Sequence, residues 1–387
     1  MFAYRLQKHR WFFSLVIFAV LLLSVFFTYT DYTKFSLRNL LPVRKCKCNP
    51  CVSELNKSEW FDKRYIPTMY PILTKNNYTL PEATYKWWQR LQHERKESNY
   101  SSIMEEMFKL FPGDDKLMEQ GPNRCRTCAV IGNSGNLKGS NYGPSIDSNN
   151  LVMRFSTDEE SKLEPYLPAW YSHSRMNRAR TVGYEADVGS KTTHHFMYPE
   201  SARDLAENVS LVLIPFKILD IQWLISAFTT GNITRTYIPV MRHIKANKDK
   251  VLVYNPHFFK YVYDNWNEHH GRYSSTGMLV IIFALHVCDE VNVYGFGANS
   301  IGHWHHYWEK NAGAGAFRAT GVHDGDFEAN VTKTLADVDL AKFQPQEITD
   351  CIGPWRAGPP GGADSLWDPS TELQQQSDYS LISFSKA

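Results

Sequence analysis

The sequence predicts an α/β fold in which helices flank a mostly parallel β-sheet. Short apolar runs of strand length recur along the chain, and stretches with helical spacing lie between them. Buried strands that alternate with helices imply a parallel sheet that is covered on both faces. With 387 residues, of which 43% are hydrophobic, the chain is long enough for one large domain or two ordinary ones.

The expected elements follow in chain order. Large apolar side chains between residues 81 and 111 recur with helical spacing: Trp87, Trp88, Leu91, Ile103, Met107, Leu110 and Phe111. The runs expected as strands are Ala129–Gly132, Leu151–Arg154, Val209–Pro215, Val251–Tyr254 and Val291–Phe296. The helical stretches between them are Ile218–Thr229, Pro256–Glu268 and Met278–Cys288. Residues 345–387 are rich in Pro, Gly, Ser, Gln and Asp, and we expect a disordered tail there.

The N-terminal region predicts a membrane anchor. Residues 11–29 carry no charge, and a helix of this length rises roughly 28 Å, about the thickness of a hydrocarbon core. Basic residues precede it, which predicts a cytosolic tail at 1–10 and a lumenal remainder. The alternative is a cleaved signal peptide, but bulky residues from Val25 to Tyr29 stand where small ones should mark cleavage. We therefore expect a single-pass type II protein with a short stem over 30–60.

Charge and glycosylation signals agree with this arrangement. A net charge of +2 is too small to indicate nucleic-acid binding. Six N-x-S/T sequons follow the expected anchor, as a lumenal location requires. They lie at Asn56, Asn77, Asn99, Asn208, Asn232 and Asn330.

Seven cysteines admit two interpretations. They are Cys46, Cys48, Cys51, Cys125, Cys128, Cys288 and Cys351. In a reducing compartment the C-x-C-x-x-C and C-x-x-C spacings would suggest zinc, whereas an oxidising lumen favours disulfides. The odd count leaves one thiol over, and Cys351 in the tail is the candidate.

Two glycine-containing segments are candidate ligand sites. After the strand at Ala129, Gly132-Asn133-Ser134-Gly135 would let backbone approach a ligand closely, although a plain strand-to-helix turn is the alternative. Later, Ser275, Thr276 and Gly277 fall at the N-cap of an apolar helix, where backbone N–H groups and the helix dipole favour an anion. The alternative there is an ordinary capped core helix.

Histidines supply the third candidate feature. His305-His306-Tyr307-Trp308 and His323-Asp-Gly-Asp-Phe-Glu328 lie close in sequence. Neither an H-E-x-x-H motif nor a carboxylate pair at ligand spacing accompanies them, so we expect no metal site.

Taken together, these segments resemble the motifs of animal sialyltransferases, glycosyltransferase family 29. Cys125–Ser148 resembles the large sialylmotif, and His270–Ala298 resembles the small one. His306-Tyr307 matches motif three, and His323-x4-Glu328 matches the very small motif. The flanking sequences are similar to the branch that makes α2,3 linkages on Galβ1-3GalNAc. The resemblance covers about residues 46–343, with one gap.

The resemblance implies a single Rossmann-like domain, a GT-A variant, over residues 61–344, with a Golgi location. It implies CMP-sialic acid (CMP-N-acetylneuraminate) as donor, inversion at the anomeric carbon, and no metal or other cofactor. The acceptor would be Galβ1-3GalNAc on glycoproteins (mucin-type O-glycans), or alternatively on glycolipids. Whether the protein forms a homodimer is left open.

The resemblance also implies roles for individual residues. His323 would be the base, His306 would stabilise the leaving phosphate, and Glu328 would fix local structure. The residues implied to bind the donor are Asn133, Asn177, Ser275, Thr276, Gly277, Tyr198 and Tyr237, with Tyr273 near the acceptor galactose. The implied disulfides are Cys128–Cys288, Cys48–Cys125 and Cys46–Cys51.

The chain departs from the family pattern at one internal segment. Residues 155–175 separate Arg154 from Met176-Asn177, which usually follow directly. This insertion is either a surface loop, since loop closure costs grow slowly with length, or a retained intron or gene-model error. Because it lies beside Asn177, a catalytically dead glycan- or nucleotide-binding variant is the alternative function. Residues 345–387 also extend past the usual end, and Ser274 replaces a common proline.

Overall fold

A computed structural model gives the fold. It describes residues 46–49, 51–52, 54, 58–91, 98–113, 115–119, 123–155, 181–297, 305–308 and 322–343, and a few residues between 17 and 25. Among all these residues no helix is both long enough and apolar enough to cross a membrane. The expected tail, the insertion beyond Phe155, Asn56, Asn177 and Cys351 lie outside the described residues.

Within the described residues, seven parallel strands form one sheet in the order β5-β4-β3-β2-β1-β6-β7. Their bounds are β1 Thr127–Ile131, β2 Leu151–Phe155, β3 His194–Met197, β4 Ser210–Leu213, β5 Val251–Val253, β6 Glu290–Tyr294 and β7 Lys342–Phe343. The parallel sheet and the expected strands are confirmed. Two strands were missed: β3 begins with two histidines, and β7 has only two residues, so neither reads as an apolar run.

The order of the strands reverses beside β1. From β1 to β5 each strand is added next to the previous one, and β6 then pairs with the opposite edge of β1. Ile131 at the end of β1 is in register with Tyr294 at the end of β6. In open parallel sheets, ligands bind outside the carboxyl ends of the strands at such a reversal.

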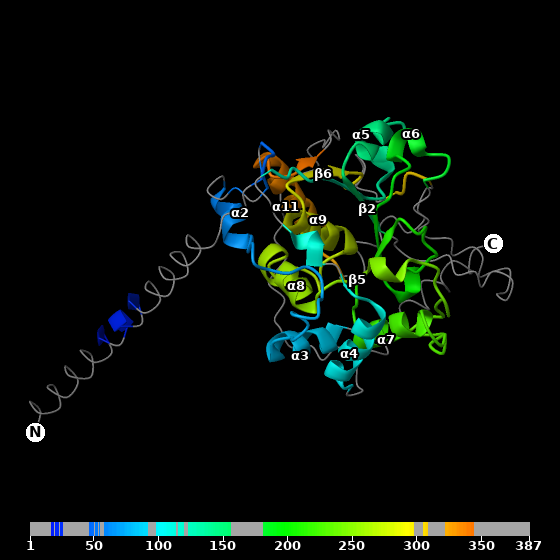
Figure 1. Ribbon diagram of the computed structural model, residues 1–387. Coiled ribbons are helices and arrows are strands. Elements are labelled where there is room, and N and C mark those ends of the chain that lie inside the picture. Colours follow the sequence, from blue (N-terminus) through cyan, green and yellow to red (C-terminus); the bar gives the residue numbers. More distant parts are fainter. Residues whose placement is uncertain are drawn as a thin grey trace, which may run out of the picture. The chain divides into compact units, whose positions relative to one another are not determined.

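Helices cover both faces of the sheet. The α-helices are α2 Glu59–Arg64, α3 Glu82–Leu91, α4 Tyr100–Leu110, α5 Gly143–Asp147, α6 Glu185–Val188, α7 Ile218–Ala227, α8 Pro256–Tyr261, α9 Thr276–Val287 and α11 Gly325–Asp337. A π-helical turn, Val262–Trp266, continues α8. The helical spacing noted between residues 81 and 111 belongs to two helices, α3 and α4. In Figure 1, α5 and α6 lie together near β2, on the opposite side from α3, α4 and α8.

Alternate residues of the central strands enter two separate cores. Cys128 and Val130 of β1 face the larger core around α9, while Ala129 and Ile131 pack with residues of α5 and α6. Every residue of α9 from Gly277 to Val287 is buried, as expected of a helix that is apolar all round. This helix runs from the carboxyl-terminal edge of the sheet, at Ser275, back to the amino-terminal edge, at Cys288.

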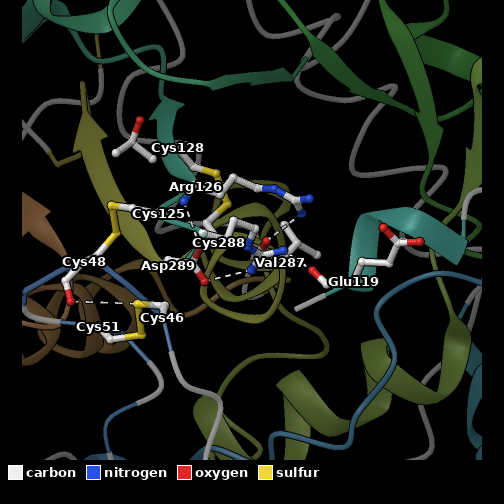
Figure 2. Close-up of polar contacts among 12 residues, drawn as sticks. Cys46, Cys48, Cys51, Glu119, Cys125, Arg126, Cys128, Val287, Cys288 and Asp289 are labelled. Atoms are coloured by element: carbon white, nitrogen blue, oxygen red, sulfur yellow. Dashed lines mark hydrogen bonds and ion pairs between the residues drawn. A yellow bond between two sulfur atoms is a disulfide. The ribbon is translucent and has the colours of Figure 1, made fainter. Parts of the chain in front are cut away.

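Three disulfides join the cysteines as the resemblance implied. They are Cys46–Cys51, Cys48–Cys125 and Cys128–Cys288, and they cluster near Asp289 (Figure 2). The last one ties the start of β1 to the end of α9 across 160 residues. Because these six sulfurs are bonded to one another, none remains as a thiolate for zinc.

The sequons described by the structure differ in exposure. Asn99, Asn208, Asn232 and Asn330 are exposed. Asn77 is half-buried, and its amide nitrogen, the atom that would carry a glycan, donates to Ile72 O at 3.2 Å. Glycosylation at these positions remains a prediction.

Candidate donor and catalytic site

The loops after β1 and β6 meet at the strand-order reversal. Gly132 N donates to Tyr294 O at 2.8 Å, and Ser134 N donates to Gly295 O at 2.9 Å. A Cβ on Gly132 would lie 2.2 Å from Gly295 O, so only glycine fits there. In the structure the group that Gly132 approaches is the neighbouring loop, and close approach of this segment to a ligand remains a prediction.

The segment at residues 305–308 lies against the β1 loop. Ser134 and His306 form an antiparallel bridge, Gly135 N donates to His305 O at 2.7 Å, and Tyr307 N donates to Asn133 O at 3.2 Å. The His306 ring stacks on Trp308 with centroids 4.5 Å apart. The fold thus places Asn133 beside His306, although they are far apart in sequence.

The N-terminus of α9 is held by a buried carboxylate. Ser275 is the N-cap, and its Oγ accepts from Met278 N at 3.2 Å. Glu328 on α11 accepts from Ser275 N at 2.7 Å, from the Ser275 hydroxyl, and from Asn267 Nδ2 at 3.0 Å. The Glu328 side chain therefore positions the N-cap of α9, and the role that the motif implied for it remains a prediction.

A small cavity lies between the first turns of α9 and α11 and the β6 loop. It has a volume of about 60 Å³, and Ser275, Phe296, Gly297 and Glu328 are among its lining residues. A Cβ on Gly277 would lie 2.8 Å from the Phe296 ring, while Ser134 Oγ donates to Gly297 O at 2.8 Å. The β6 loop thus connects the β1 loop with the start of α9, where Thr276 is the first helical residue.

The ring of His323 is oriented by a backbone carbonyl. His323 Nδ1 lies 2.8 Å from Tyr273 O. Because a carbonyl oxygen only accepts, Nδ1 carries the proton in this contact, and in the neutral ring Nε2 is the basic nitrogen. The Tyr273 ring packs edge-on against His323 at 5.1 Å.

Backbone contacts fix the segment that carries His323. Arg272 N donates to Val322 O at 2.8 Å, and His270 Nδ1 lies 3.0 Å from Asp324 Oδ2. Gly271 has a φ of +70°, and a Cβ there would lie 2.9 Å from Asp324 N. This close packing brings the segments His270–Gly277 and His323–Glu328 together.

Aromatic rings extend from His323 toward the other tyrosines. Tyr273 packs on Phe216 at 5.3 Å, and Phe216 packs on Tyr198 at 5.6 Å. Tyr237 is 45% exposed, and its ring lies 5.4 Å from Lys217 Nζ. The sequence-predicted residues that the structure describes therefore lie on neighbouring loops, at the start of α9 and on α11.

Several residues that shape the candidate site were not identified from the sequence. Phe296 and Gly297 lie in the loop that begins at Gly295, directly after β6, and the rule that singled out Gly132 could have found this loop. Asn267 carries no such local signal, because its partner Glu328 is remote in sequence. Lys217 has a local partner in Asp220, three residues on, but its contact with Glu200 has no local signal.

Comparison with known proteins agrees with these motifs. Residues 72–159 and 174–340 match the sequence profile described as glycosyltransferase family 29 (sialyltransferase). A chicken (Gallus gallus) protein, CMP-N-acetylneuraminate-beta-galactosamide-alpha-2,3-sialyltransferase 1, is 58% identical over 303 residues, covering 78% of this chain and 82% of the relative. The human (Homo sapiens) protein of the same name is 52% identical over 309 residues, covering 80% and 85%.

Two solved structures are also similar. The crystal structure of a mammalian sialyltransferase matches with a TM-score of 0.68 at 51% identity, covering 78% of this chain and 99% of that chain. A mammalian sialyltransferase in complex with Gal-beta-1-3GalNAc-ortho-nitrophenol matches with a TM-score of 0.67 at 50% identity, covering 77% and 98%.

Proposed function

Since the chain belongs to glycosyltransferase family 29, the sialyltransferases, we propose that it transfers sialic acid from CMP-N-acetylneuraminate to the 3-hydroxyl of galactose in Galβ1-3GalNAc. The names of the relatives and the bound disaccharide of the similar structure support this acceptor. The observation that carries the mechanism is the contact between His323 Nδ1 and Tyr273 O, because it leaves Nε2 as the basic nitrogen.

In the proposed reaction, His323 Nε2 takes the proton of the galactose 3-hydroxyl. The oxygen attacks the anomeric carbon of sialic acid, a carbon–oxygen bond forms, and the bond to the CMP phosphate breaks on the opposite side with inversion. The electron pair leaves with CMP. His306 and the N-terminus of α9, with Ser275, Thr276 and Gly277, would stabilise that phosphate, since a helix N-terminus favours an anion. Asn133, Tyr198 and Tyr237 would also bind the donor, as would Asn177, which lies outside the described residues.

We also propose that no metal takes part. CMP is a monophosphate leaving group, whose charge a histidine and a helix N-terminus can balance. Activity in excess EDTA should equal that in added Mg²⁺, and a requirement for the cation would contradict this part.

The N-terminal charge pattern and the three disulfides support a type II protein of the Golgi membrane with a lumenal catalytic domain. The family match breaks between residues 159 and 174, inside the segment interpreted as an insertion. Sequencing the transcript across Arg154–Met176 would decide whether that segment is translated.

The test of the base is a pair of histidine variants of the full chain. His323→Ala should lower the acceptor-dependent release of CMP by at least about 100-fold, the usual contribution of a general base. His269→Ala is the matched control, because the His269 side chain is 66% exposed and bonds to Asp264. Near-normal activity in a folded His323→Ala protein would contradict the assignment. Release of CMP without dependence on acceptor would indicate hydrolysis instead of transfer, and no release by the wild type would favour a dead binding protein.

A further inference from the structure

Three buried charged side chains lie beside the site without a part in the proposed chemistry. Lys217 Nζ lies 2.8 Å from Asp220 Oδ1 and 3.4 Å from Glu200 Oε1. The three residues are between 0 and 8% exposed. Burying such ions is costly, and replacing a buried ion pair by apolar residues is often neutral or stabilising, so the cluster is weak evidence for stability alone.

The cluster joins two loops that carry predicted donor-binding tyrosines. Glu200 lies in the turn Pro199–Ser201, which directly follows Tyr198. The hydroxyl of Thr236 donates to Glu200, and Thr236 immediately precedes Tyr237. Lys217 Nζ also lies 5.4 Å from the centre of the Tyr237 ring. One carboxylate and one ammonium group therefore connect the Tyr198 loop to the Tyr237 loop.

The third member connects the cluster to the aromatic chain. Asp220 Oδ2 accepts from Phe216 N at 2.8 Å and from Lys217 N at 3.2 Å. Phe216 is the ring that lies between Tyr198 and Tyr273. The charged cluster is thus attached to the aromatic rings that lead to His323.

The charge balance argues against direct phosphate binding by Lys217. Two carboxylates surround one ammonium group, so its positive charge is already neutralised. Burial raises the pKa of Asp220 from 3.8 to about 7, as expected when two carboxylates share one cation. A cluster without excess positive charge is suited to fastening loops.

We propose that Glu200, Lys217 and Thr236 are positioning residues that hold Tyr198 and Tyr237 at the separation that binding of the donor phosphate requires. The proposal rests on the proposed function, in which both tyrosines contact the donor. In this proposal the three residues affect the affinity for the donor through the two tyrosines and do not contact the substrate themselves.

The test uses a hydroxyl that can be removed and restored. Thr236→Val keeps the shape of the side chain but removes the bond to Glu200, and Thr236→Ser keeps the hydroxyl. We expect Thr236→Val to raise the KM for CMP-sialic acid about tenfold, roughly the effect of losing one hydrogen bond to a charged group. The acceptor KM should change less than twofold, and Thr236→Ser should restore the donor KM.

A matched control lies at the opposite edge of the sheet. Asp289 is buried and accepts from Arg124 Nε at 2.8 Å and from Arg126 N at 2.7 Å, beside the disulfides (Figure 2). Asp289→Asn should lower the melting temperature without changing the donor KM. If Thr236→Val behaves like Asp289→Asn, with a lower melting temperature and an unchanged donor KM, the cluster is structural only and the proposal is wrong.

Direct binding of CMP separates this proposal from the proposed function. If the wild type binds CMP but does not sialylate Galβ1-3GalNAc, the proposed acceptor function fails. The Thr236 variants are then compared by their affinity for CMP, measured by calorimetry, in place of the donor KM. A tenfold loss of CMP affinity in Thr236→Val, restored in Thr236→Ser, would still support the positioning role, and equal affinities would overturn it. If the wild type binds no CMP, both proposals fail.

Discussion

Replacing Glu328 should show what its carboxylate does. In Glu328→Ala, the amide of Ser275 and the side-chain amide of Asn267, which is 0% exposed, would lose their acceptor. Hydrogen bonds to charged groups contribute about 1.5–3 kcal/mol each, so these two together predict a loss of about 3–6 kcal/mol in unfolding free energy. The Ser275 hydroxyl can rotate toward another acceptor and adds less.

Glu328→Gln should behave differently. Its amide oxygen can take the place of Oε1 and keep both of those bonds, while its NH2 group can donate to Ser275 Oγ. We therefore expect a loss below about 1.5 kcal/mol, the usual net contribution of one hydrogen bond. Urea unfolding of the full chain in detergent at pH 7 measures both losses. A loss in Glu328→Gln as large as in Glu328→Ala would refute the reasoning, because the charge itself would then matter more than the bonds.

Other changes have equally definite outcomes. The double variant Cys128→Ala, Cys288→Ala removes the disulfide that closes a loop of 160 residues. By the loop-entropy relation its unfolding free energy should fall by about 5 kcal/mol, and a fall below about 2 kcal/mol would contradict this. Burial lowers the pKa of His194 from 6.5 to about 4 and that of His195 to about 3, so both are neutral when folded but protonated when unfolded below pH 6.5. Their contribution to the free energy of unfolding is complete above pH 6.5, and it falls by roughly 2 kcal/mol for each histidine between pH 6.5 and 5. Equal urea midpoints at pH 7 and pH 5 would argue against this. Gly132→Ala should abolish CMP binding in calorimetry, since its Cβ would displace the β6 loop, and normal affinity would show that the loops can separate.

Much of the fold was predictable because its strands carry local signals. The strand at Leu151 and the apolar helix after Ser275 can be predicted from their composition alone. The strand at His194–Met197 does not, because its two histidines are buried by tertiary packing that no local pattern reveals.

The candidate site was predictable only through the combination of its motifs. Each motif allowed a structural alternative, and the resemblance selected among them. The bond from Ser275 to Glu328, the orientation of His323 by Tyr273 O, and the pairing of Lys217 with Glu200 depend on contacts between distant segments. Such contacts follow from the topology, and sequence spacing does not encode them.

The central claim is that a site built on the loops after β1 and β6 and at the start of α9 makes an α2,3 linkage from CMP-sialic acid. The most direct measurement is the NMR structure of the product formed by the full chain from CMP-sialic acid and Galβ1-3GalNAc, with the 3-deoxygalactose disaccharide as a parallel acceptor. The account predicts sialic acid in α-configuration on the galactose 3-oxygen and no product from the deoxy compound. A product with another linkage, or equal transfer to the deoxy compound, would contradict it.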